Sequence, residues 1–191
     1  MSLSNFIYLN LKFKEKVKLY YFSLKHKKEL EIEMALPSYN DVYNIKKVYP
    51  NLETVDYEII GGMIFMDLTL NHLELEDFEN LSYIFTNDSI YNKNLIISSI
   101  LLNPKILENN VSSPAIIKKI NENDVQTLND LRKALKSPIK KDKNYFIKIE
   151  FDNKNISYFN IKELIEIDEL VSEKYNYKIS EIIKVYKKLL K

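Results

Sequence analysis

The 191-residue sequence contains no cysteine, only two glycines and a single arginine, Arg132. The absence of cysteine excludes disulfide bonds, thiolate nucleophiles and cysteine-ligated metals, and it fits a reducing compartment without identifying one. A single arginine leaves little means for the bidentate contacts that recognise phosphates and base edges. Basic and acidic residues nearly balance at a net charge of +1, which gives no global field to attract nucleic acid. We therefore expect no redox chemistry and no nucleic-acid partner.

Long apolar runs are also lacking. The longest stretches, such as residues 95–102, fall well short of the roughly 20 residues that a membrane span needs. The N-terminal MSLSNFIYLNLKFKEK has no small-residue cleavage site, and its apolar run is broken at Asn10 and Lys12. We expect a soluble protein without a membrane span or a targeting signal, and the compartment stays open.

Hydrophobic alternation predicts two β-hairpins. Residues 17–24 are rich in Tyr, Phe, Leu and Val, and residues 30–34 alternate apolar with charged side chains after a polar turn. Residues 145–151 alternate in the same way, and the pattern resumes at residues 156–159. Such alternation is typical of strands that keep one face in solvent.

Two amphipathic helices are predicted in the second half of the chain. Thr127 and Asp130 stand at the N-cap and N3 positions of an approximate capping box, ahead of regularly spaced leucines. Ser180 is a suitable N-cap for residues 181–190, which end in lysines as a helix dipole favours. Hairpins and helices together indicate an α+β fold.

Both glycines stand together, Gly61 and Gly62, directly before the apolar run 63–66. Adjacent glycines favour positive φ or close approach of another group, and consecutive N–H groups in such a turn can bind an anion. The C-terminal carboxylate of a peptide is one such anion. A tight turn that enters a strand explains the same pair without a ligand, and both interpretations stay open.

The segment 57–69, YEIIGGMIFMDLT, resembles the start of the second PDZ-like domain in Deg/HtrA-type serine proteases. In that domain an aromatic residue, a glycine and a short apolar strand come in the same order. The segment 113–128, SPAIIKKINENDVQTL, is similar to the run in which an apolar strand meets an Asn-Gly turn before a helix. Glu122 replaces the turn glycine, so Asn121 or Asn123 must supply any left-handed conformation.

The resemblance covers about residues 55–175 and implies a PDZ-like, partly open β-barrel or sandwich with two short helices. A β-hairpin precedes this fold and C-terminal helices follow it. The expected organisation is a hairpin segment 1–36 that resembles the end of a first PDZ domain, a connector 37–55, a PDZ-like domain 56–161 and a helical extension 162–191. The polar stretch 103–113 is expected to be a surface loop and is a candidate plug for the groove.

The resemblance also implies a peptide-binding groove. Its candidate residues are Gly61, Gly62, Met63, Ile64, Phe65, Leu128, Leu131 and Leu135. The N–H groups of residues 62–64 would face a ligand carboxylate, and the strand through residues 65 and 66 would pair with the peptide. Leucines at helical spacing are also typical of an ordinary core face, so the helix wall has a second interpretation.

Catalytic and metal sites are not evident in the sequence. No serine-nucleophile turn of the protease type is present, and His26 and His72 lie outside any triad context, so we expect no enzyme activity. Without zinc-type ligand spacing we expect no metal and no cofactor.

Three hypotheses follow. The leading one is a non-catalytic PDZ-type module that binds a protein or peptide C-terminus, or neighbouring subunits of an assembly, with homo-oligomerisation left open. The second is the C-terminal regulatory fragment of a Deg-type protease whose catalytic domain lies elsewhere. The third is a structural subunit of a larger complex, whose groove is occupied by its own chain.

Overall fold

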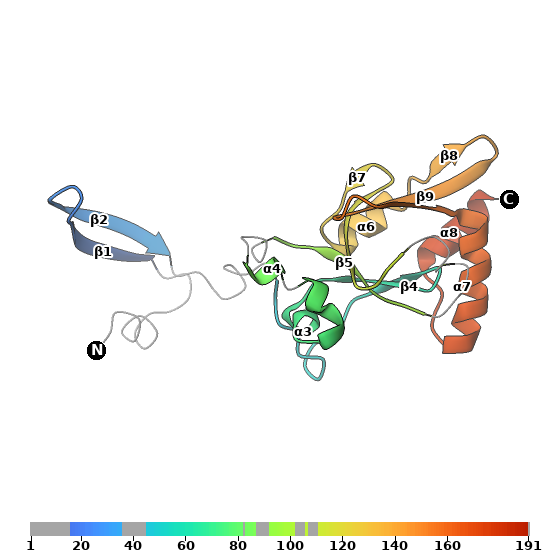
Figure 1. Ribbon diagram of the computed structural model, residues 1–191, viewed down its shortest axis with the longest axis horizontal. Coiled ribbons are helices and arrows are strands. Elements are labelled where there is room, and N and C mark those ends of the chain that lie inside the picture. The colour runs from blue at the N-terminus through green and yellow to red at the C-terminus, as the bar shows by residue number, and fades with distance from the viewer. Residues whose placement is uncertain are drawn as a thin grey trace. The chain divides into compact units, whose positions relative to one another are not determined.

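The computed structural model describes residues 16–35, 45–81, 83–86, 92–101, 106 and 111–190. The chain divides into two compact units, residues 1–44 and 45–191. The expected α+β fold is confirmed: a curled antiparallel sheet carries short helices, with a β-hairpin before it and two helices after it (Figure 1). Among the described residues, no helix combines the length and the hydrophobicity of a membrane-spanning segment.

The first unit contains the predicted hairpin. Strands β1 (Lys16–Ser23) and β2 (Lys28–Ala35) pair antiparallel, with Leu19 opposite Ile32 and Tyr21 opposite Leu30. Because successive side chains point to opposite faces, these four apolar residues share one face. Tyr21 is 48% exposed and Ile32 47% exposed. Within the described part of this unit, nothing covers that apolar face.

The second unit is built on one eight-stranded sheet in the order β10-β9-β6-β5-β4-β3, with β7 on β6 and β8 on β9. All of its strand pairs are antiparallel. The strands are β3 (Glu58–Ile60), β4 (Met63–Asp67), β5 (Leu95–Ile100), β6 (Ala115–Ile120), β7 (Asn123–Asp124), β8 (Ile139–Lys141), β9 (Asn144–Phe151) and β10 (Ile156–Asn160). The second predicted hairpin is therefore confirmed as β9 and β10.

The described helices of this unit are α3 (Leu70–Leu73), the 3-10 helix η1 (Glu76–Leu81), α4 (Tyr83–Thr86), α6 (Leu128–Ala134), α7 (Ile161–Tyr175) and α8 (Glu181–Leu189). They belong to two separate cores. Leu95 and Ile97 of β5 lie in the larger core with α6, α7 and α8. Ile96 between them lies in the smaller core with η1 and α4. Strand β5 is apolar at successive positions because both of its faces are covered.

The predicted helix starts are confirmed. Thr127 Oγ1 accepts a hydrogen bond from Asp130 N at 3.2 Å, and Asp130 Oδ2 accepts one from Thr127 N at 3.1 Å, which completes the capping box of α6. Ser180 Oγ accepts a hydrogen bond from Ile182 N at 3.2 Å and caps α8. Each cap satisfies an N–H group that has no partner within its helix.

The turn between β6 and β7 is left-handed at two non-glycine residues. Asn121 has φ 48° and Glu122 has φ 67°. Asn121 thus supplies the conformation that the sequence required, and Glu122 shares it, whereas Asn123 does not. The Asn121 side chain accepts a hydrogen bond from Lys148 N at 2.9 Å and donates one to Ala134 O at 3.2 Å. These bonds hold the turn between β9 and the end of α6.

The stretch 103–113 differs from expectation where it is described. Ile106 is fully buried and Val111 nearly so, and both lie in the larger core. The prediction of a surface loop is therefore wrong at these two positions, because burial of their apolar side chains in the core is favourable although most of the stretch is polar. Residues 103–105 and 107–110 lie outside the described part of the chain.

A buried histidine stabilises the start of α3. His72 Nδ1 accepts a hydrogen bond from Thr69 N at 3.1 Å, and the ring lies 5.2 Å from that of Phe78. Burial lowers the pKa of His72 below its ordinary value, since a charged imidazole is poorly solvated there.

This lowered pKa predicts acid sensitivity. The unfolded chain binds a proton at His72 more readily than the folded chain does. The free energy of unfolding should therefore be unaffected by His72 above about pH 6.5, and it should decrease as the pH falls below that value. Denaturant unfolding at several pH values checks this. The variant His72→Gln should lose less stability on acidification than the wild type. An unchanged slope in His72→Gln contradicts the prediction.

Candidate functional site

The two glycines form the turn of the β3–β4 hairpin. Ile60 pairs with Met63, so Gly61 and Gly62 make a two-residue loop, with φ 59° and φ 78°. Positive φ at both central residues is the type I′ turn, which matches the twist of the strands it joins. Gly62 O accepts a hydrogen bond from Leu101 N at 2.8 Å.

Most residues that the sequence proposed for a peptide groove lie in the interior. Both glycines are buried, and Ile64 is half-buried. Met63, Phe65, Leu128, Leu131 and Leu135 belong to the larger core and are each at most 3% exposed. The fold thus brings the expected strand and helix together, with these side chains directed into the core between them.

Strand β4 has a neighbour on each edge. On one side β3 pairs with it, with Glu58 opposite Phe65. On the other side β5 pairs with it, with Ile97 opposite Phe65. A peptide that binds by β-augmentation needs a free strand edge. The edge of β4 away from β5 is taken by β3, the segment that precedes it in the chain.

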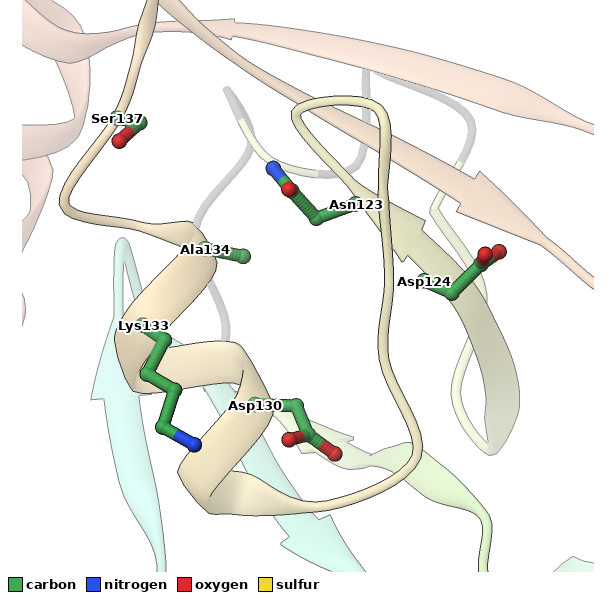
Figure 2. Close-up of a pocket in the computed structure, with 6 residues that line it drawn as sticks. All are labelled: Asn123, Asp124, Asp130, Lys133, Ala134 and Ser137. Carbon is green, nitrogen blue, oxygen red and sulfur yellow. The ribbon is translucent and has the colours of Figure 1, made fainter.

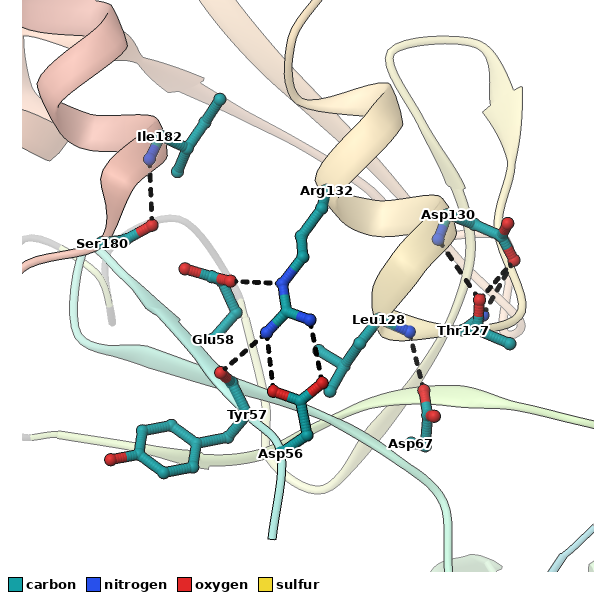
Figure 3. Close-up of polar contacts among 10 residues, drawn as sticks. All are labelled: Asp56, Tyr57, Glu58, Asp67, Thr127, Leu128, Asp130, Arg132, Ser180 and Ile182. Atoms are coloured by element: carbon teal, nitrogen blue, oxygen red, sulfur yellow. Dashed lines mark hydrogen bonds and ion pairs between the residues drawn. The ribbon is translucent and has the colours of Figure 1, made fainter. Parts of the chain in front are cut away.

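Helix α6 holds the open end of this hairpin (Figure 3). Arg132 Nε donates to Glu58 Oε2 at 2.7 Å, and its two terminal nitrogens donate to the two Asp56 carboxylate oxygens at 2.8 and 2.7 Å. A hydrogen bond from Arg132 lowers the pKa of Asp56, and the carboxylates, Asp56 first, raise the pKa of Arg132. Leu128 N donates to Asp67 Oδ1 at 2.7 Å at the end of β4.

Helix α7 covers the other end of the hairpin, the glycine turn. A Cβ atom placed on Gly61 would lie 2.4 Å from Leu164 Cδ2, and one on Gly62 would lie 3.7 Å from Val171 Cγ1. A larger side chain at Gly61 requires the Leu164 side chain to move. The turn therefore has glycines for two reasons, the left-handed backbone and the close approach of a helix.

Asp168 of α7 lies at the same turn and is completely buried. Its Oδ1 accepts a hydrogen bond from Tyr177 Oη at 2.7 Å, whereas Oδ2 has no hydrogen-bond partner among the described residues. Burial raises the pKa of Asp168, while the backbone N–H groups of Gly61 and Gly62 and the Tyr177 hydroxyl act to lower it. The glycine turn thus faces a carboxylate, and that carboxylate comes from the chain itself.

The sequence analysis did not identify Asp168, nor the bonds by which Arg132 joins α6 to the β3–β4 hairpin. Ile161, Leu164, Ile165, Val171 and Ser172 form the buried stripe of α7, and Asp168 falls on that stripe at helical spacing. A lone acid on an apolar stripe is the signal that was available. The sequence shows that Arg132 is the only arginine of the chain, but it does not show which residues Arg132 contacts.

Two hollows beside α6 are lined in part by groups that are already in use. A polar hollow of about 240 Å³ lies beside α6 (Figure 2), lined by Asn123, Asp124, Asp130, Lys133, Ala134 and Ser137. Asn123 donates to Asn121 O, and Asp130 belongs to the α6 cap. A more apolar cleft of about 320 Å³ lies between Arg132, Leu135 and the start of α8. Across the described ranges, no cluster of three His, Asp or Glu side chains could hold a metal ion.

The close contact at Gly61 predicts a large difference between the two glycines. Gly61→Ala should lower the free energy of unfolding by about 2–4 kcal/mol, from a left-handed alanine plus overpacking against Leu164. Gly62→Ala carries the same backbone cost, but its nearest contact, Leu101 O at 3.4 Å, is far less severe, so its loss should be smaller. Urea unfolding of both variants measures the difference. An equal or larger loss in Gly62→Ala is incompatible with the packing of α7 on the turn.

The comparisons with known proteins agree with this architecture. A family model described as a PDZ domain matches residues 48–181, more than two thirds of the chain. The matched range begins before β3 and ends at the start of α8. It therefore contains the whole eight-stranded sheet, the glycine turn and Asp168. A comparison with curated protein sequences gave no match. The chain therefore belongs to the PDZ domain family.

Proposed function

We propose that this chain is a non-catalytic protein-binding and assembly module whose peptide groove is filled by its own residues. PDZ domains bind proteins or peptide ends, often by adding a strand to a free sheet edge. The observation that supports the proposal is the pairing of β4 on both edges, by β3 and by β5. Partners then bind to other surfaces of the module, as subunits of an assembly.

The energetics favour β3 over an incoming peptide. A free peptide loses translational and rotational freedom on binding, whereas β3 is tethered to β4 through a two-residue turn. The Arg132 bonds to Asp56 and Glu58 add to this advantage. An external strand could pair with β4 only by displacing β3 and breaking these bonds first.

The setting that we propose is the regulatory region of a Deg/HtrA-type serine protease. The resemblance of residues 57–69 and 113–128 to the second PDZ-like domain of such proteins supports it. In this setting catalysis belongs to another domain, and the present chain contributes binding and assembly.

The hairpin of the first unit favours this setting. A two-stranded sheet is marginally stable alone in water, and Leu19, Tyr21, Leu30 and Ile32 form one apolar face. The opposite face carries the ion pair between Lys18 and Glu31 at 2.7 Å. Tyr20 and Phe22 lie on that opposite face as well and are exposed. A sheet with one apolar face and one mixed, partly charged face is suited to complete a larger sheet structure, such as the end of a preceding PDZ domain.

A peptide panel tests the filled groove. The chain is titrated with peptides that carry a free C-terminal carboxylate and with their amidated forms, and binding is followed by fluorescence anisotropy. Amidation should leave any binding unchanged, because the turn and the β4 edge are occupied. A loss of about tenfold or more in affinity on amidation would establish exchangeable carboxylate capture and overturn the proposal.

Hydrogen exchange tests the role of the hairpin. Amides of residues 16–35 should exchange with solvent much faster than those of β4 and β5, since the hairpin is expected to need a partner sheet. Slow exchange in the hairpin, comparable to that of β5, would show that its apolar face is already covered in this chain. The proposed role in completing a preceding domain would then fail.

A further inference from the structure

The hairpin turn has the features of an anion site. Gly61 and Gly62 are both left-handed, and α7 packs on them through Leu164 and Val171. The completely buried Asp168 lies between these two residues on the same face of the helix. Consecutive backbone N–H groups in such a turn form a concave site for an anion. The Gly62 carbonyl oxygen accepts a hydrogen bond from Leu101 N. Its negative partial charge is therefore not directed at an anion that binds to the N–H groups.

The Asp168 side chain is positioned at the turn by α7 and by a hydrogen bond from Tyr177. The helix α7 supplies the side chain, and the chain reverses after α7 through Asn176, which has φ 53°. This reversal returns Tyr177, whose hydroxyl donates to Asp168 Oδ1 at 2.7 Å. Oδ2, buried and without a hydrogen-bond partner among the described residues, remains available to the turn.

We infer that the Gly61–Gly62 turn is a carboxylate-binding site whose ligand, the side chain of Asp168, is built into the chain. The inference rests on the proposed self-occupied groove and identifies the group that fills its anion position. A side-chain carboxylate has the same planar pair of oxygens as a peptide C-terminus, so the same N–H donors serve either one. Removal of the Asp168 carboxyl group then leaves a site that accepts a small carboxylate from solution.

The first experiment is chemical rescue. Asp168→Ala should melt at a lower temperature than the wild type, and sodium formate should raise its melting temperature by several degrees in a saturable way. Sodium chloride at equal ionic strength and uncharged formamide should not do so. The wild type and Glu173→Ala, which removes an exposed acid from the same helix, should not respond to formate. An equal response to formate and chloride, or an equal response in the wild type, overturns the inference.

The second experiment does not depend on the stability of the alanine variant. The chain has only two glycines, so their amide resonances are easily followed in ¹H–¹⁵N NMR spectra. Asp168→Asn keeps the side-chain shape and removes the charge, and it should shift the amide protons of both Gly61 and Gly62. Glu173→Gln should shift neither. Unchanged glycine amides in Asp168→Asn overturn the inference, whereas the peptide panel can still support the filled groove.

Discussion

The geometry of the site depends on one constraint, the left-handed turn at Gly61 and Gly62. A type I′ turn fixes the register of β3 on β4, and a shift by one residue would send every side chain of the strand to the other face. Because Gly61 has no Cβ atom, Leu164 of α7 can pack directly on the turn. The fixed register and the close helix together place Met63 and Phe65 in the core.

The hairpin is held at both ends by different forces. At its open end the interaction is polar and partly exposed: Arg132 joins α6 to the start of β3, with its side chain 38% exposed. Ion pairs of this exposure contribute modestly to stability but fix geometry well when they are bidentate. At its closed end the interaction is apolar contact with Leu164 and Val171 around a buried carboxylate. The strand that occupies the groove is thereby held along its whole length.

A buried carboxylate in this position is a cost that the fold tolerates. Asp168 lies on the apolar stripe of α7, where an aliphatic residue would avoid loss of hydration. Its raised pKa reflects that loss, and the glycine N–H groups and Tyr177 offset part of it. A buried polar group of this kind can specify one arrangement over others, since a helix shifted along the turn would leave the charge unpaired. This gives α7 a defined position on the hairpin.

The sequence by itself determined the local elements. Alternation predicted both hairpins, the caps at Thr127 and Ser180 predicted the helix starts, and the paired glycines predicted a special turn, because these signals act over a few residues. Only the tertiary structure decided what the turn faces and what lies beside β4. Asp168 is more than a hundred residues from Gly61, and Arg132 more than seventy from Asp56, so each pairing depends on how the sheet folds the chain back on itself. Local patterns carry no information on such partners, since they are set by packing of distant segments.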